Sequence, residues 1–235
     1  MSQINRIDGG LIDQEKVLNF TFNGQILKGY EGDTLASALL ANNKHLIGRS
    51  FKYHRPRGIV TAGSEEPNAI MEIGNGAYRE PNTRATVTQL YNGLEANSQN
   101  HRGPLSFDFM AITDFLSPLL GAGFYYKTFM WPKAFWEKFY EPAIRKSAGL
   151  GTLSTEADPD TYDKGFRHCD ILIIGAGATG LSAALTAAES GAKIILADED
   201  FLMGGRLNSE TNEIDGIAGS EWAKKTVAKL GAMEN

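Results

Sequence analysis

The sequence predicts a two-domain chain, an α+β domain followed by an α/β unit, because its two halves differ in hydrophobic pattern. The first half alternates apolar and polar residues around a hairpin turn at Asn23-Gly24. The second half holds an unbroken apolar run that leads into glycines at residues 171–180. With 235 residues, 42% of them hydrophobic, the chain is long enough for one large or two modest cores.

Composition excludes several classes of protein. A net charge of -5 leaves no overall basic face for a nucleic acid backbone. Cys169 is the single cysteine, so the chain can build no internal disulfide or multi-cysteine metal site, and a reducing cytoplasm fits best. Residues 1–17 do not resemble a signal peptide. The most apolar stretch, 105–126, is interrupted by charged residues and a proline, whereas a membrane span needs about 20 largely uncharged residues.

The first domain is expected to begin with a β-hairpin over residues 17–30 and a short helix packed on it. Asp33 or Thr34 serves as the helix N-cap, and Asn42-Asn43 ends the helix. A basic loop follows at 50–58, and residues 69–73 and 84–90 are predicted strands. This order of elements resembles the β-grasp fold of plant-type ferredoxins, and we place the domain at 1–103.

A connecting segment is expected at residues 104–166. Residues 107–140 hold 12 of the 23 aromatic side chains, a density that favours burial against neighbouring domains or under a partner subunit. Residues 147–164, rich in small and polar residues, are a predicted linker.

The third region, 167–235, is predicted to be a partial dinucleotide-binding (Rossmann-like) domain. Gly175, Gly177 and Gly180 form a GxGxxG pattern, in which the glycines allow a tight turn, close approach of a pyrophosphate and close helix packing. The helix that follows presents Leu181, Ala184, Leu185 and Ala188 on one face, and its N-terminal amides favour a diphosphate.

Asp198 ends the next predicted strand, 193–197, where a carboxylate can accept hydrogen bonds from the adenosine ribose. A 2′-phosphate would be repelled there, so NAD or FAD is favoured over NADP, and the fingerprint does not separate NAD from FAD. Gly204-Gly205 and Arg206 follow closely and are candidates for cofactor contact, with a simple surface turn as the alternative.

Three segments together resemble the N-terminal portion of the alpha subunit of heterotetrameric sarcosine oxidases. They are RIDGGLID with FNGQILKGYEGDTLASALLANN, GRSFKYHRPRGIVTAGSEEPNA, and CDILIIGAGATGLSAALTAAESGAKIILADED followed by MGGRL. The resemblance implies an enzyme that oxidatively demethylates sarcosine to glycine, with beta, gamma and delta partner subunits. It implies FAD in the beta subunit, FMN between alpha and beta, and noncovalent NAD in the alpha subunit.

The resemblance adds Thr179, Asp198, Glu199 and Arg206 to the glycines Gly175, Gly177, Gly180 and Gly205 as expected NAD contacts. Two features depart from related subunits. The loop SFKYHRPRGIVTAGSEEPNA has no cysteine, so the ferredoxin-like domain is expected to hold no [2Fe-2S] cluster, which needs about four thiolates. The chain also ends before a dinucleotide-binding domain is complete, so we expect a fragment, inactive in isolation, with weak NAD binding and marginal stability in that half.

The remaining candidate residues are expected to have structural or solvent-exposed roles. The basic loop residues Lys52, His54, Arg55 and Arg57 are expected to be solvated, with a flavin phosphate or a partner's acids as the alternative. No histidine has metal-ligand spacing, Cys169 is expected to be a buried unreactive thiol, and no catalytic constellation is found. Two further functions stay open: a noncatalytic nucleotide-binding scaffold, and a subunit of an oxidase or dehydrogenase for another secondary amine or amino acid.

Overall fold

The computed structural model describes residues 3–7, 10–127, 129–149 and 151–233, and their contacts divide into two compact units. The first unit contains residues 1–60, 66–85 and 90–159. The second contains 61–65, 86–89 and the chain from residue 160 onward.

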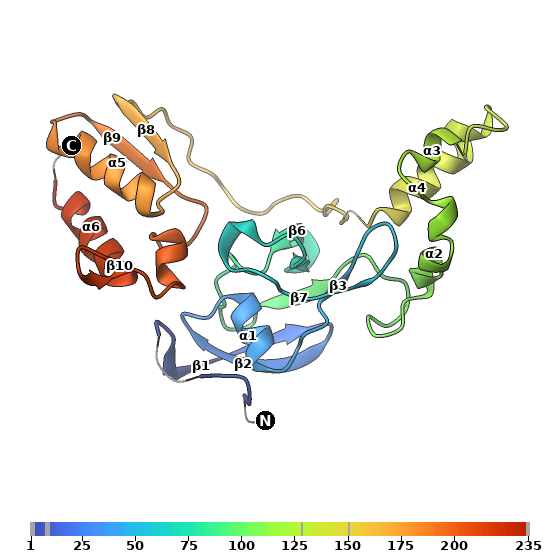
Figure 1. Cartoon of the computed structure of the whole chain (residues 1–235), viewed down its shortest axis with the longest axis horizontal. Helices are drawn as coiled ribbons and strands as arrows, with labels where there is room; N and C mark the ends of the chain where they lie inside the picture. The colour runs from blue at the N-terminus through green and yellow to red at the C-terminus, as the bar shows by residue number, and fades with distance from the viewer. Residues whose placement is uncertain (1–2, 8–9, 128, 150, 234–235) are drawn as a thin grey trace. The chain divides into compact units, whose positions relative to one another are not determined.

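The first unit is built on a five-stranded mixed sheet in the order β2-β1-β7-β5-β6 (Figure 1). Its strands are β1 (Asp13–Phe22), β2 (Gln25–Glu31), β5 (Ile70–Ile73), β6 (Glu80–Arg84) and β7 (Glu95–Ser98). The pairs β1·β2, β5·β7 and β5·β6 are antiparallel, and β1·β7 is parallel. A small hairpin joins β3 (Gly48–Arg49) to β4 (Pro56–Arg57). The predicted ferredoxin-like β-grasp fold is confirmed.

The predicted hairpin and helix at the start of this unit are also confirmed. Asn23 and Gly24 both have positive φ, 49° and 76°, as a tight hairpin turn requires. Helix α1 (Leu35–Ala41) begins at Thr34, whose hydroxyl accepts the N–H of Ser37 while the Ser37 hydroxyl accepts the N–H of Thr34. Asn42 is the C-cap. Of the two N-cap candidates, Thr34 takes the role.

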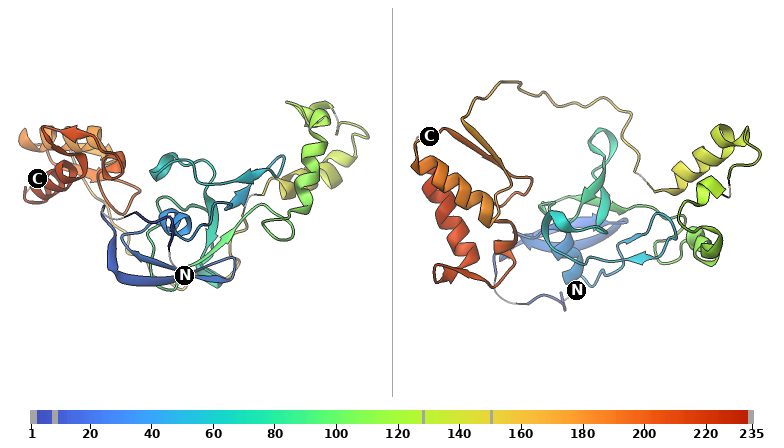
Figure 2. Two further views of the ribbon diagram at one scale, coloured as in Figure 1. Left: turned by 60° about the horizontal axis from the view of Figure 1, so that its bottom comes forward. Right: turned by 45° about the horizontal axis from the view of Figure 1, so that its top comes forward.

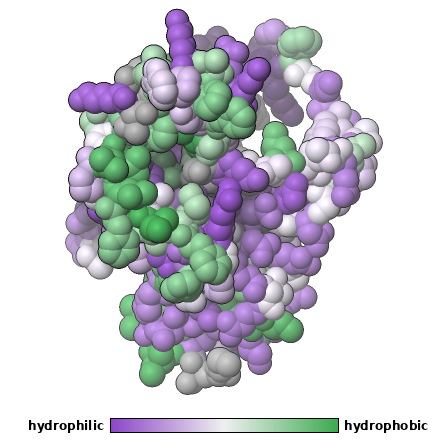
Figure 3. Space-filling model, turned by 90° about the vertical axis from the view of Figure 1, so that its right-hand side faces the viewer, coloured by the Kyte–Doolittle hydropathy of each residue, from purple (hydrophilic) through white to green (hydrophobic). Residues whose placement is uncertain are grey.

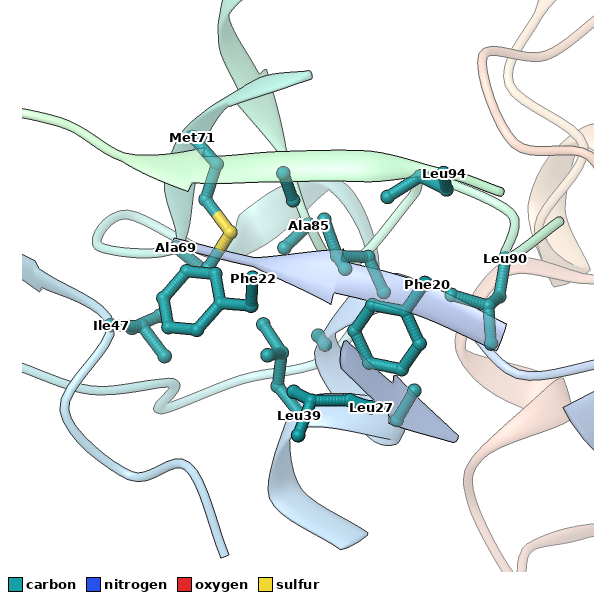
Figure 4. Packing of buried hydrophobic residues seen from close by; sticks show 14 residues of the cluster. Phe20, Phe22, Leu27, Leu39, Ile47, Ala69, Met71, Ala85, Leu90 and Leu94 are labelled. Carbon is teal, nitrogen blue, oxygen red and sulfur yellow. The ribbon is translucent and has the colours of Figure 1, made fainter. Parts of the chain in front are cut away.

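The core of the first unit lies between α1 and the sheet (Figures 2 and 4). Phe20 and Phe22 of β1 point toward Leu39 of α1, with Met71 of β5 beside them (Figure 4). All four side chains are buried, so the alternation predicted for the hairpin places its phenylalanines in one apolar layer.

The strand predicted at 84–90 is wrong. Strand β6 ends at Arg84, and the N–H of Ala85 then donates to Ala69 O while Ala85 O accepts the N–H of Ala36, which holds the chain at a turn beside α1. No hydrophobic pattern predicts β7, because its residues EANS include only one apolar side chain. β7 is nevertheless central, since β1 and β5 pair with its two edges.

The loop that lacks cysteines is organised by a buried carboxylate. Glu66 is 1% exposed and accepts the backbone N–H groups of Val60 (2.8 Å), Asn68 (2.7 Å) and Ala69 (3.2 Å). Hydrogen bonds to an ionised acceptor are among the stronger ones in proteins. Glu66 therefore fixes the conformation of this loop, which has no cysteine to bind an iron-sulfur cluster.

The aromatic-rich segment forms short helices: α2 (Ile112–Phe115), α3 (Phe124–Lys127) and α4 (Glu141–Ser147), with 3-10 turns at Phe109–Ala111 and Ser117–Leu119 and a π-helical turn at Trp136–Tyr140. Many of its large side chains are exposed, among them Phe107, Phe109, Phe115, Trp131, Phe135 and Phe139. Hydrophobic side chains gather on the face shown in Figure 3. Burial inside this chain, the first of the two expectations, is not observed for these residues. Residues 151–170 contain no helix or strand, as predicted for the linker.

The second unit contains a parallel pair of strands, β8 (Ile171–Ile174) and β9 (Ile194–Ala197), joined by α5 (Ala178–Glu189). Then follow the 3-10 helix η6 (Gly205–Asn208), the hairpin β10 (Glu213–Ile214) and β11 (Ile217–Ala218), and α6 (Gly219–Gly231). Leu181, Leu207 and Ala223 form the centre of its core.

An unbroken apolar run such as that of β8 is typical of a strand covered on both faces, but within the described residues one face of β8 is uncovered. Ile173 faces α5, but Leu172 and Ile174, which point to the opposite side, are 58% and 75% exposed. Cys169, expected to be buried, is half-buried at the entrance to this strand.

Candidate dinucleotide-binding site

The glycine-rich loop connects β8 to α5 with a geometry that depends on two of its glycines. Gly175 has φ +99°, in the region that favours glycine. A Cβ on Gly180 would overlap the carbonyl oxygen of Gly175, so a side chain there would force α5 away from the strand. Gly175 and Gly180 therefore have the roles that the sequence predicts for them.

Gly177 is the N-cap of α5 and faces open space. A Cβ built on it would meet no atom within 4 Å among the described residues. Because glycine has no side chain to accept the first helical N–H groups, these amides remain available at the positive end of the helix dipole. A diphosphate fits this position by charge and by space.

Asp198 follows β9 and reaches back to the glycine-rich loop. Its carboxylate accepts the N–H of Ala176 through Oδ2 and the N–H of Asp200 through Oδ1 (2.8 Å). These bonds fix the orientation of the carboxylate at the carboxyl ends of the two strands, where nucleotides bind in open α/β sheets. A carboxylate oxygen has more than one lone pair, so both oxygens can accept further hydrogen bonds.

The double glycine lies against the same loop. The N–H of Gly204 donates to Ala176 O (2.9 Å), and a Cβ on Gly205 would lie 3.2 Å from the Cα of Gly177. Gly204 and Gly205 both have positive φ, 128° and 52°. Gly177 and Gly205, 28 positions apart in the chain, thus lie side by side on one surface formed by backbone atoms. From the sequence, the double glycine was a candidate only because it follows Asp198 closely in the chain.

The remaining three predicted contacts lie on the surface near this loop. Arg206 is paired with Glu210 (2.6 Å) and Glu65 (3.4 Å). Thr179 is exposed in the first turn of α5, and Glu199 is exposed beside Asp198. The structure therefore brings together Gly175, Gly177, Gly180, Asp198 and Gly205, and it places Thr179, Glu199 and Arg206 outside that group.

Asp200 is a titratable neighbour that the sequence analysis missed. Burial raises its pKa above the usual value of 3.8, and the carboxylates of Asp198 and Glu199 raise it further, against hydrogen bonds from the N–H groups of Phe201 and Leu202. Three consecutive acids at 198–200 were the available signal.

The basic loop also differs from its expectation. His54 is not solvated: it is 3% exposed, and its Nδ1 lies 2.6 Å from Oδ2 of Asp108. Arg55 is paired with Asp114 (2.6 Å). No local sequence pattern indicates these pairs, because the partners lie more than 50 residues apart.

Two family descriptions match parts of the chain. Residues 15–101 match the 2Fe-2S iron-sulfur cluster binding domain, and residues 170–230 match the FAD dependent oxidoreductase family. Residues 15–101 contain no cysteine, so the first match concerns the fold and not the cluster ligands. The second match confirms the fold predicted for this region, and the family that it names is FAD dependent.

Known relatives are similar over nearly the whole chain. The chain is 60% identical to "Sarcosine oxidase subunit alpha" of Rhizobium meliloti over 96% of its length. The predicted resemblance to sarcosine oxidase alpha subunits is confirmed. Alpha subunits of the same name from Corynebacterium sp. strains U-96 and P-1 are 33% and 34% identical. The chain spans 23%, 19% and 18% of the lengths of these three relatives, and it corresponds to their N-terminal part.

A solved structure, L-proline dehydrogenase from P. horikoshii, superposes with a TM-score of 0.49 at 17% identity, covering 93% of this chain and 32% of the other. In the described part of the chain, no group of three or more His, Cys, Asp or Glu side chains is arranged to hold a metal ion. No helix within those residues is both long and apolar enough to cross a membrane.

Proposed function

We propose that this chain is part of the alpha subunit of a flavin-dependent sarcosine oxidase, which oxidatively demethylates sarcosine to glycine. The observation that carries the proposal is the 60% identity to the Rhizobium meliloti alpha subunit over 96% of the chain. The partners are then beta, gamma and delta subunits, with FAD and FMN in the assembled complex. The single cysteine is compatible with the reducing cytoplasm as its location.

We propose NAD as the dinucleotide of this chain. Support comes from the open backbone at Gly177, the uncapped N-terminus of α5 and the Asp198 carboxylate on one edge of the parallel strands. The amides of α5 would bind the pyrophosphate, Gly205 would allow its close approach, and Asp198 would accept the ribose hydroxyls. Thr179, Glu199 and Arg206 border this surface as further contacts. A bound FAD, which presents the same ADP group, is the alternative, and it is favoured by the match of residues 170–230 to an FAD dependent family.

The boundaries proposed for the three regions are 1–103, 104–166 and 167–235. Residues that carry out the oxidation are not assigned to this chain. Its own contribution is to bind the nucleotide and to contact the subunits that hold the flavins.

The test is to co-express the full-length alpha chain with the neighbouring genes and to analyse the purified complex. Nucleotides released on denaturation should be NAD, and flavin absorbance should bleach on addition of sarcosine. A complex that retains flavin but does not respond to sarcosine would contradict the substrate, and release of FAD alone from the alpha chain would contradict NAD.

Asp198→Ala should reduce the NAD content of this complex by about tenfold or more, because a charge-assisted hydrogen bond to the ribose is lost. Glu213→Ala is the matched control, since this acid is exposed in β10 of the same unit, away from the glycine-rich loop. Equal NAD contents in the Asp198→Ala and unmodified complexes would overturn the assigned role of Asp198.

A further inference from the structure

A cavity of about 290 Å³ in the first unit is lined by polar side chains from four separate segments, one of which contributes Glu72 of β5. His54 comes from the loop between β3 and β4, a second group follows β7, and a third lies at the end of α4. The side chains used below are those of His54, Asn100, His101, Arg102, Lys146 and Thr152. The volume is at the lower end of the range of ligand pockets, about 300–1,000 Å³.

The wall formed by the end of α4 is held in place by close packing. A Cβ on Gly149, which has φ +66°, would overlap the side chain of Asn100. A Cβ on Gly151 would overlap the ring of Pro81, and the N–H of Gly151 donates to Asn82 Oδ1 (3.2 Å). The two glycines thus allow this segment to approach the sheet closely and to form one side of the cavity.

His54 presents a buried nitrogen without a partner to this region. Asp108 is fully buried and accepts the N–H groups of Arg102 and Met110, both at 2.9 Å, as well as the Nδ1–H of His54 at 2.6 Å. An ionised carboxylate accepts and does not donate, so the proton of this contact belongs to Nδ1. Nε2 is then left buried with no hydrogen-bond partner among the described residues. Such a group is costly unless something binds it.

The cavity is lined by more positive than negative side chains. Arg102 and Lys146 both line it, and neither guanidinium nor ammonium forms an ion pair with a described residue. The lining acid, Glu72, lies 3.9 Å from Arg79. His101 is already committed, with Nε2 at 2.8 Å from the Ser98 hydroxyl and Nδ1 at 2.8 Å from Gly103 O. Two cations and one imidazole nitrogen therefore remain for a ligand.

We propose that this cavity binds a small organic oxyanion, a carboxylate or a phosphate monoester. Arg102 and Lys146 contact the anionic group, and Asp108 orients the imidazole. His54 Nε2, the acceptor nitrogen of this tautomer, accepts a hydrogen bond from a protonated oxygen of the ligand, as in hydrogen phosphate or hydrogen succinate. Arginine and lysine are the side chains that bind such groups in proteins. Asn100 and Thr152 line the remainder of the cavity and offer neutral hydrogen bonds.

Isothermal titration of the full-length chain with inorganic phosphate and with succinate tests the proposal, with sodium chloride at equal ionic strength as the salt control. We expect saturable binding of at least one probe, and the stronger of the two identifies phosphate or carboxylate chemistry. The His54 imidazole ¹⁵N resonances should shift on binding of the same probe. Absence of saturable binding by both probes at millimolar concentration would overturn the proposal.

Surface variants make the test independent of folding defects at buried His54. Arg102→Gln and Lys146→Gln should each weaken binding by about tenfold, because each removes one charge-assisted contact. Lys138→Gln is the matched control, since Lys138 is exposed on the same aromatic-rich segment and does not line the cavity. Unchanged affinity in both Arg102→Gln and Lys146→Gln, or an equal loss in Lys138→Gln, would show that the anion binds elsewhere.

Discussion

Asp33 and Arg6 form a buried ion pair that attaches the N-terminal segment to the first unit. Arg6 Nη2 lies 2.7 Å from Asp33 Oδ2 and Nη1 lies 3.2 Å from Oδ1, with side-chain exposures of 9% and 0%. Asp33 also accepts the N–H of Tyr30 and the hydroxyl of Ser37. The residue that the sequence offered as an N-cap is therefore the centre of a polar network.

Asp33→Ala should lower the free energy of unfolding of the first unit by about 3–5 kcal/mol, because it leaves the Arg6 charge buried without its partner. Urea unfolding, followed by hydrogen exchange in peptides from β1 and α1, measures the change. The double variant Arg6→Met/Asp33→Ala should recover part of the loss, since no uncompensated charge remains. If the double variant is as unstable as the sum of the single variants, the pair is not coupled as described.

The His54–Asp108 pair predicts a pH dependence of stability. Although burial alone would raise the pKa of Asp108, hydrogen bonds from the N–H groups of Arg102 and Met110 and from His54 hold it below its usual value of 3.8. A carboxyl with a lowered folded-state pKa contributes stability that is complete above the unfolded value of 3.8. That contribution is lost as the pH falls through the folded-state pKa.

Asp108→Asn should therefore destabilise the first unit by about 1.5–3 kcal/mol near neutral pH, because it replaces a charged hydrogen-bond acceptor by a neutral one. The difference between variant and unmodified chain should shrink as the pH falls below 3.8. Urea unfolding from pH 3 to pH 7 measures it. A difference that stays constant across this range would contradict an ionised Asp108 in the folded state.

At the scale of elements, sequence patterns succeeded where one local signal was sufficient. The Asn23-Gly24 turn, the Thr34 cap and the glycines of the β8–α5 loop each require a particular residue at one position, so the residue type identifies the conformation. Strand β7 was not predicted, because its stability comes from pairing on both edges, and no local sequence pattern reflects such pairing. The cavity and the His54–Asp108 pair could not be predicted from the sequence for the same reason, since segments distant in the chain form them.

The glycines of the dinucleotide loop have separable roles that substitution can distinguish. Gly180→Ala should destabilise the second unit by about 1–3 kcal/mol, because the new Cβ overlaps Gly175 O and displaces α5 from β8. Gly177→Ala meets open space, so it should change stability by less than about 0.5 kcal/mol while weakening nucleotide binding. Thermal unfolding and nucleotide content of the complex provide the two measurements.

Gly231→Ala supplies the control for helix propensity. Gly231 lies in the last turn of α6, where an added Cβ would meet no atom within 4 Å of the described residues. Alanine favours a helix over glycine by up to about 1 kcal/mol, so this variant should be neutral or more stable. If Gly180→Ala behaved like Gly231→Ala, close packing between α5 and β8 would not be the reason for glycine at 180.

At the scale of the whole molecule, the aromatic-rich segment is the main part of the first unit without a cover. Phe115 is 86% exposed and Trp131 83% exposed. Hydrophobic side chains gather on the face of the molecule shown in Figure 3. Contiguous exposed apolar surface in a folded protein is typical of an interaction site. The similar proteins are named as subunits, so another subunit of the proposed oxidase is the expected partner for this surface.

Phe115→Ser combined with Trp131→Ser should weaken co-purification of the alpha chain with its partner subunits while leaving its own unfolding nearly unchanged. Both side chains are exposed, so folding buries little of their area, whereas an interface loses two large aromatic contacts of a kind that often dominates binding. Tyr162→Ser is the matched control, because Tyr162 is 65% exposed in the linker and lies outside the aromatic-rich helices. Pull-down of the partner subunits, quantified against the alpha chain, measures the effect. Normal assembly of the double variant would show that this surface contacts something other than those subunits.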